Sequence, residues 1–189
     1  MQRISTTFIL TLILCGIAFA QDLQNQRRNL MPVPANITWK SGRFPVDKDF
    51  SVSFTGFSEE RLKQYVSRVT RRLEGRTILE FSREFSNDSA NSNLLIETRS
   101  TGNAIPKLGD DESYNLEITD KQAKLTAATT VGAMRGLETL LQLLERDKDG
   151  FYFPAVSIQD KPRFPWRGLM IDSARHFQPM EVLKRNLDA

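Results

Sequence analysis

Cysteine and histidine are nearly absent from this chain of 189 residues, which has one of each. The cysteine, Cys15, lies in an apolar N-terminal segment, and removal of that segment leaves no thiol for disulfide bonds or cysteine catalysis. The histidine, His176, has no second histidine or cysteine with which to hold a metal ion, so we expect a hydrogen-bonded structural role. The sequence therefore predicts no metal site and no cofactor.

Positive charge is in small excess. The formal net charge is +3, and removal of the N-terminal segment with its one charged residue, Arg3, leaves +2. Arg68, Arg71, Arg72 and Arg76 cluster on one predicted helix, but cations are favourable near a helix C-terminus, and a solvated face explains them. We therefore expect no nucleic-acid partner.

The first twenty residues have the pattern of a secretory signal peptide. Arg3 precedes an apolar stretch from Phe8 to Leu14, and the small-x-small sequence Ala18-Phe19-Ala20 follows. We expect cleavage after residue 20 and export, to the periplasm or outside the cell, with no membrane attachment afterwards; an uncleaved anchor is the alternative. Residues 21–34 are expected to be a leader outside the folded core.

Residues 35–159 carry alternating strand and helix signals and predict one domain with its own core. Residues 50–54 alternate apolar side chains with serine, as in a strand with one buried face. The next segment predicts a helix capped by Ser58 and ended by Gly75, with an apolar stripe made by Leu62, Tyr65, Val66, Val69 and Leu73.

Shorter strands follow this helix. Residues 78–81 could form one, and a polar loop at 86–93 leads to a buried strand at 94–96. Residues 114–118 and 123–125 alternate around a turn and predict a hairpin.

A second helix is predicted after the hairpin, capped by Thr129 or Thr130, with Gly132 and Gly136 allowing close packing. A last strand at 151–158 contains Pro154, which places it at an edge or a bulge. Together these signals predict an α+β domain with a mostly antiparallel sheet and two helices on one face.

An acidic trio, Asp110, Asp111 and Glu112, precedes the hairpin. Paired carboxylates can serve as general acid and base, but this trio follows Gly109 in a predicted loop, with no base or metal ligand beside it. We do not expect it to be catalytic.

The most informative stretch lies near the C-terminus. A short apolar run, Gly168 to Ile171, is followed by Asp172 and Arg175, the pattern of a buried strand that ends in a polar loop. In (β/α) barrels, the C-terminal ends of strands carry the substrate-binding residues. Asp172 and Arg175 are therefore candidate site residues, and a helix is predicted to start at Gln178-Pro179.

The stretch DKPRFPWRGLMIDSARHF, residues 160–177, resembles the entry into the catalytic barrel of glycoside hydrolase family 20, the β-N-acetylhexosaminidases. A second segment, AATTVGAMRGLETLLQLL at residues 127–144, is similar to the helix that closes their small N-terminal domain. The resemblance implies that residues 35–159 form the non-catalytic α+β domain. It also implies that residues 160–189 contain the first strand and part of the first helix of a truncated (β/α)8 barrel.

The resemblance also implies a chemistry. Family 20 enzymes hydrolyse terminal β-linked N-acetylhexosamine by substrate-assisted retaining catalysis: the 2-acetamido oxygen attacks the anomeric carbon, a Glu is general acid and base, and the preceding Asp orients the acetamido group. That Asp-Glu pair belongs to an H-x-G-G-D-E type motif that this sequence lacks, so we expect no catalytic residue here and an inactive chain. The implied partners are glycans containing N-acetylhexosamine, or chitooligosaccharides.

In this family the arginine of the D-x-x-R-H-F pattern contacts sugar hydroxyls, so the resemblance assigns substrate binding to Arg175; an ion pair with Asp172 is the alternative. Asp172 is the weaker candidate, since holding the strand end or Arg175 would explain it. Trp166 precedes the strand, on the barrel face that provides stability, and we expect it to pack there. Two other functions stay open: a non-catalytic interaction or scaffold module, and another family 20 activity such as lacto-N-biosidase or chitobiase.

Overall fold

The computed structural model describes residues 30–188. The predicted signal peptide and most of the leader lie outside the described residues. The elements within them are, in order, β1 (Asn36–Val46), β2 (Val52–Gly56), α2 (Glu60–Thr77), β3 (Leu94–Ser100), β4 (Tyr114–Ile118), β5 (Ala123–Thr129), α3 (Thr130–Gln142), β6 (Glu145–Asp147), β7 (Gly150–Asp160) and α4 (Met180–Asp188). No helix in this part of the chain is long and apolar enough to cross a membrane.

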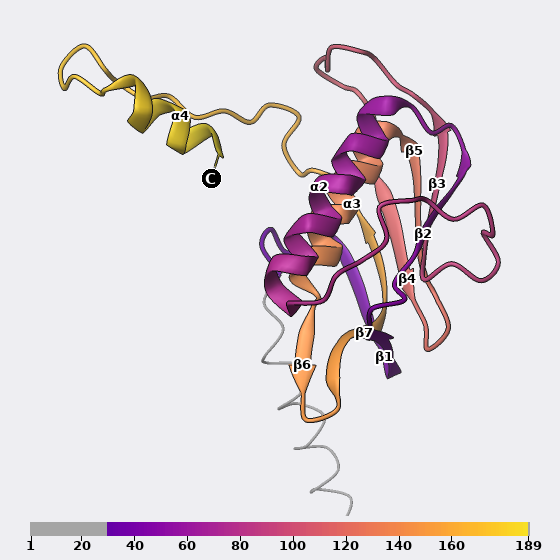
Figure 1. The fold of residues 1–189 in the computed structure, drawn as a ribbon. Coiled ribbons are helices and arrows are strands. Elements are labelled where there is room, and N and C mark those ends of the chain that lie inside the picture. The colour runs from indigo at the N-terminus through magenta and orange to yellow at the C-terminus, as the bar shows by residue number, and fades with distance from the viewer. Residues whose placement is uncertain (1–29, 189) are drawn as a thin grey trace, which may run out of the picture.

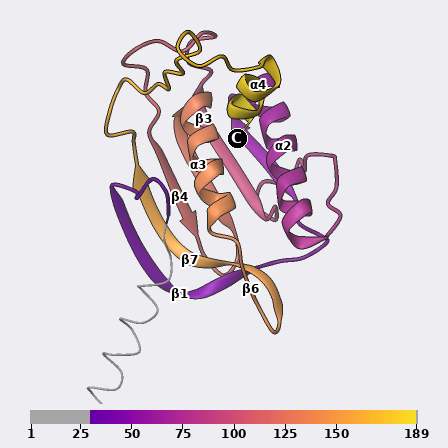
Figure 2. The same cartoon turned by 90° about the vertical axis from the view of Figure 1, so that its left-hand side faces the viewer.

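One sheet contains the strands in the order β1-β7-β4-β5-β3-β2, with β6 paired to β7. The pairings β2–β3 and β3–β5 are parallel, and the other four are antiparallel. Helices α2 and α3 cover the same face of this sheet (Figure 1 and Figure 2). The predicted α+β class is therefore confirmed, but the sheet is mixed, and its two parallel pairings were not anticipated.

The core lies between the two helices and the sheet face that they cover. Its largest fully buried side chains come from both layers: Phe153, Leu62, Leu73, Leu94, Ile96, Leu116, Ile118, Leu125, Leu137, Leu140, Leu141 and Ile158. In β4 and β5 these alternate with polar residues on the opposite face, where Lys124 pairs with Glu97 at 2.9 Å. Leu30, which lies within the predicted leader 21–34, is also buried in this core, so the leader does not stay wholly outside it.

Helix α2 begins and ends at residues other than those expected. Its N-cap is Glu59, which makes no side-chain capping bond, so Ser58 is not the cap. The helix passes through Gly75 and ends only at Ile78, which has a left-handed φ of 61° and donates its N–H to the carbonyl of Glu74. Because Gly75 keeps a helical conformation, the predicted stop was wrong, and no strand forms at 78–81.

Helix α3 matches the prediction closely. Thr129 is its N-cap, and its hydroxyl accepts the N–H of Gly132 at 3.2 Å. A Cβ on Gly132 would lie 2.4 Å from the carbonyl oxygen of Ser113, and one on Gly136 would lie 2.3 Å from Leu125. The two glycines therefore allow α3 to lie directly on the sheet.

Pro154 lies in an interior strand. β7 pairs with β1 along its length, while its other side pairs with β6 as far as Tyr152 and with β4 from Val156 onward. Pro154 falls between these two ladders, so its missing N–H costs no sheet hydrogen bond on that side. The edge assignment was thus wrong, while the bulge alternative fits, since β1 shifts register between Trp39 and Arg43 opposite this proline.

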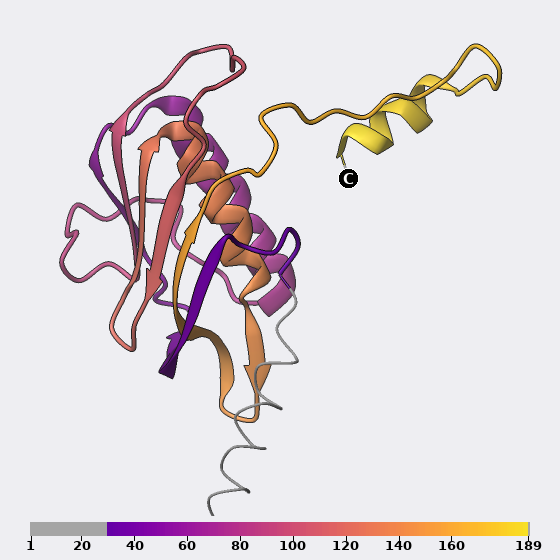
Figure 3. The same cartoon turned by 180° about the vertical axis from the view of Figure 1, so that it is seen from behind.

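The chain after β7 leaves the two-layer domain as an irregular segment that ends in α4 (Figure 1 and Figure 3). The predicted buried strand is absent here: residues 168–171 form no strand, and Leu169 and Met170 are 78% and 92% exposed. Their apolar pattern is real, but no strand of the described chain pairs with them, so nothing buries them. The predicted helix does form, as α4.

Candidate functional site

The candidate residues Asp172 and Arg175 form a closed local unit on this exposed segment. The Asp172 carboxylate accepts the backbone N–H of Ala174 at 3.0 Å and that of Arg175 at 3.1 Å, and it accepts Nε–H of Arg175 at 2.5 Å. These backbone and side-chain hydrogen bonds from Arg175 lower the pKa of Asp172. Asp172 is therefore committed to shaping the turn that carries Arg175.

Arg175 itself is open to solvent. Its side chain is 90% exposed, and its two terminal nitrogens have no hydrogen-bond partner among residues 30–188. A guanidinium held by Nε presents its outer N–H groups as a fork, which suits paired oxygen acceptors such as neighbouring hydroxyls. The ion pair that was offered as the alternative role of Arg175 thus exists, and it leaves the outer edge of the guanidinium exposed to solvent.

Two further predictions for this segment are corrected. His176 is exposed and makes no hydrogen bond within the described residues, so the expected structural role is not present. Trp166 is 79% exposed and does not pack against the domain. Both residues flank the uncovered stretch 168–171, and they remain in solvent for the same reason. Within residues 30–188 no group of His, Cys, Asp and Glu is arranged to hold a metal ion.

The acidic trio has a structural role, and its third member, Glu112, contacts two arginines that are distant in sequence. Asp110 accepts from the Asn103 side chain, and Asp111 accepts the N–H of Ser113. Glu112 accepts from both Arg135 and Arg167. Burial raises the pKa of Glu112, but the hydrogen bonds from the two arginines outweigh burial and lower it overall.

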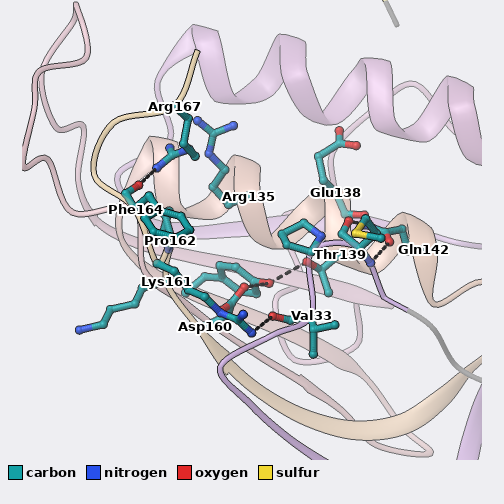
Figure 4. A pocket seen from close by; sticks show the side chains of 14 residues that line it. Val33, Arg135, Glu138, Thr139, Gln142, Asp160, Lys161, Pro162, Phe164 and Arg167 are labelled. Atoms are coloured by element: carbon teal, nitrogen blue, oxygen red, sulfur yellow. Dashed lines mark hydrogen bonds between the residues drawn. The ribbon is translucent and has the colours of Figure 1, made fainter. Parts of the chain in front are cut away.

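A cavity of about 510 Å³ lies where the chain leaves the domain, and the sequence analysis did not predict it. Its wall combines the chain before β1, one side of α3 and the stretch 160–167 (Figure 4). Because these segments are far apart in sequence, no local pattern could have revealed it. Neither Asp172 nor Arg175 lines it.

Several polar groups of this cavity are hydrogen-bonded to one another or to nearby backbone. Tyr114 lies 2.7 Å from the Thr139 hydroxyl and donates to Asp160 at 3.1 Å, while Asp160 also accepts the N–H of Ala35. Burial, opposed by Thr139 and reinforced by Asp160, raises the pKa of Tyr114.

The second carboxylate of the cavity wall, Glu138, is also occupied by hydrogen bonds within the domain. It accepts from the Tyr65 hydroxyl and from Arg72, each at 2.6 Å. Both carboxylates thus tie structural elements together, and the cavity offers no free acid and base pair for catalysis.

Two family profiles match the chain. The profile described as "beta-acetyl hexosaminidase like" matches residues 30–143, and that of the glycosyl hydrolase family 20 catalytic domain matches residues 164–189. Residues 144–163, which contain β6 and β7, lie outside both matches, and the second match begins just after β7, where the structure passes from the two-layer domain to the exposed segment.

Individual proteins that are similar to this chain in structure or sequence are hexosaminidases and related enzymes, in agreement with the two profiles. The chitobiase of Flavobacterium johnsoniae superposes with a TM-score of 0.78 at 44% identity, covering 87% of this chain and 25% of that one. An exo β-N-acetylglucosaminidase of Vibrio harveyi, solved with N-acetylglucosamine, has a TM-score of 0.63 at 26% identity, covering 85% and 23%. The β-hexosaminidase subunit A1 of Dictyostelium discoideum is 31% identical over 176 residues, covering 92% and 32%.

The chain thus spans about a quarter to a third of the length of these relatives. The two profile matches cover the α+β domain as far as the end of α3 and then the segment that carries Arg175. Since the hexosaminidase-like profile accounts for more than half of its length, this chain belongs to glycoside hydrolase family 20.

Proposed function

We propose that this chain provides the N-terminal domain and the first catalytic-domain segment of a β-N-acetylhexosaminidase, which releases terminal β-linked N-acetylhexosamine from glycans or chitooligosaccharides. The observation that carries the proposal is the Asp172–Arg175 unit, which lies inside the match to the catalytic domain and holds a guanidinium fork open to solvent. The relatives from Vibrio harveyi and Streptomyces plicatus, solved with N-acetylglucosamine and with Thio-NAglucal, support this substrate class.

In this proposal the chain binds substrate and does not perform the chemistry. Arg175 donates to hydroxyls of the terminal sugar, and Asp172 fixes the direction of its fork. The acetamido group of the substrate acts as nucleophile, and the Asp-Glu pair that assists it is supplied from outside these 189 residues. Residues 1–20 direct export, so the exported chain should begin at Gln21 when its N-terminus is sequenced.

A chimera tests the proposal. The chain replaces the matching quarter of the Flavobacterium johnsoniae chitobiase, and release of a chromophore from an N-acetylglucosaminide is measured. Arg175→Ala should lower kcat/KM about 10- to 100-fold, the effect of losing a charged hydrogen bond to substrate. Arg175→Lys keeps the charge without the fork and should recover only part of the activity.

Arg185→Ala is the matched control, because Arg185 is an exposed arginine of α4 with no ion pair to a described residue. Equal activity of the Arg175→Ala and Arg185→Ala chimeras would refute the binding role of Arg175. The 189-residue chain on its own should release no chromophore, and turnover that survives repurification would contradict the proposed division of labour.

One observation favours a second candidate function, a non-catalytic interaction or scaffold module. Within the part of the chain that the structure describes, every buried hydrophobic residue lies between Leu30 and Ile158, so the α+β domain completes its core without the segment that follows. A chimera that folds and melts cooperatively but never turns over substrate, whatever residue stands at position 175, would favour this module over the enzyme.

A further inference from the structure

We propose that Glu112 is a positioning residue that anchors the start of the Arg175 segment to the α+β domain. The inference builds on the proposed function, in which Arg175 binds the sugar. Its physical basis is a single carboxylate that joins the loop before β4, helix α3 and the chain after β7.

The contacts converge on Glu112 from two sides. Nη2 of Arg167 lies 2.6 Å from both carboxylate oxygens, and Nε of Arg135 lies 2.7 Å from one of them. Arg167 also donates from Nη1 to the carbonyl of Phe164, which folds its own segment back on itself. Arg135 and Arg167 lie side by side at one end of the cavity (Figure 4).

Burial distinguishes this contact from an ordinary surface ion pair. The Glu112 side chain is 17% exposed, whereas Arg135 and Arg167 are 51% and 41% exposed. A largely buried carboxylate that is shared by two guanidinium groups has its acceptor sites filled in fixed directions. Exposed pairs on flexible side chains lack this constraint.

The neighbouring chain is restrained as well. Arg163 donates to the carbonyl of Val33 at 3.2 Å, which gives the segment a second attachment to the domain. Pro162 and Pro165 fix the backbone φ on either side of Phe164. Arg167 is thus held to the domain directly before Gly168. The Asp172–Arg175 unit follows a few residues later in the same segment. The position of Arg167 therefore determines where the chain that leads to Arg175 leaves the domain.

Trypsin measures this anchor directly in the 189-residue chain, because it must take the arginine side chain into its specificity pocket. Glu112→Gln should speed cleavage after Arg167 about tenfold, by releasing a charge-assisted contact. Cleavage after Arg175 is the internal reference, since that side chain is already exposed and should be cut at the same rate in both proteins.

Asp110→Asn is the matched control: it removes a neighbouring carboxylate of the same loop, one that contacts Asn103 and the N–H of Lys107. It should leave cleavage after Arg167 unchanged. Glu112→Asp retains a carboxylate and should restore part of the protection. The anisotropy of Trp166 fluorescence, in a Trp39→Phe background, should fall in Glu112→Gln and recover in Glu112→Asp.

Two outcomes would overturn the proposal. Unchanged cleavage after Arg167 in Glu112→Gln would show that the carboxylate does not hold this arginine. Equal acceleration at Arg167 and at sites within the domain would show that Glu112 stabilises the whole domain instead of the segment. Neither measurement uses catalytic activity, so an inactive chimera would refute the proposed enzyme and leave this anchor standing.

Discussion

Substitution of Gly132 by alanine tests how closely α3 lies on the sheet. The added Cβ would stand 2.4 Å from the carbonyl oxygen of Ser113 and 3.2 Å from the Cβ of Ala127. The first of these is a backbone atom just before β4, so relief requires a shift of the helix or of the strand end. Gly75 provides the opposite case. It lies at an exposed position of α2, and a Cβ added there would have no neighbouring atom within 4 Å.

The magnitudes follow from these two environments. Overpacking of a close contact costs about 1–3 kcal/mol, so Gly132→Ala should lower the free energy of unfolding by about 2 kcal/mol. Gly75→Ala should raise it by about 0.5–1 kcal/mol, because alanine loses less backbone entropy in a helix. The two alanine variants should therefore differ by about 3 kcal/mol, or about 6–12 °C in Tm for a chain of this size.

Urea unfolding checks the prediction. Trp39 packs against the core and reports on it, and a Trp166→Phe background removes the exposed second tryptophan. The slope of free energy against urea should stay constant among the variants, so that midpoint shifts reflect stability. The reasoning fails if Gly132→Ala is as stable as Gly75→Ala.

Three other changes should alter stability. Ile78→Gly should raise the unfolding free energy by about 1 kcal/mol, because Ile78 is 93% exposed with a φ of 61°; urea midpoints would show it, and no gain would contradict it. Thr129→Ala should cost about 1 kcal/mol through loss of the α3 cap, with Thr129→Ser nearly neutral in the same assay. Burial, with help from Glu138, raises the pKa of Tyr65 from 10 to about 12, so the folded state should lose stability as pH rises from 10 toward 12. Tyr65→Phe should make that part of the profile shallower, while Tyr114, whose pKa is also raised, keeps part of the fall; an unaltered profile would count against the assignment.

Features with a complete local signal were predictable from the sequence. The hairpin of β4 and β5 has alternating residues on both sides of a short turn, and its register pairs Leu116 with Leu125 as the alternation requires. Helix α3 has a capping threonine followed by an apolar face, and Thr129 does cap it. In each case the signal lies within a few residues of the structure that it specifies.

Two of the missed features depend on partners distant in sequence, and the third depends on an unusual backbone conformation. β3 lies parallel to both β2 and β5, and nothing in its own seven residues distinguishes that position from an antiparallel one. The end of α2 is set by Ile78, a β-branched residue in a conformation that glycine usually adopts, so the sequence pointed to Gly75 instead. The cavity beside α3 forms where three segments distant in sequence meet, so the sequence of any one segment does not predict it.

The contact between the two candidate residues was predictable because they lie three positions apart in sequence. Asp172 and Arg175 make one local turn, so their mutual contact needs no distant partner. The surroundings of the site were not predictable in the same way. Glu112 was set aside as a loop carboxylate, yet it contacts an arginine 55 residues later in the chain.

The two parts of the chain differ in what they bury, and this difference explains how each was predicted. The α+β domain encloses its own apolar side chains, so patterns within it correspond to burial in the structure. The segment after β7 keeps its large apolar side chains exposed, namely Phe164, Trp166, Leu169, Met170, Ile171, Phe177, Met180 and Leu187. That density of uncovered apolar surface is typical of an interaction surface, and the segment lies within the match to the family 20 catalytic domain. Burial thus separates the two parts of the chain, and Glu112, which binds Arg167 through its carboxylate, lies where one part gives way to the other.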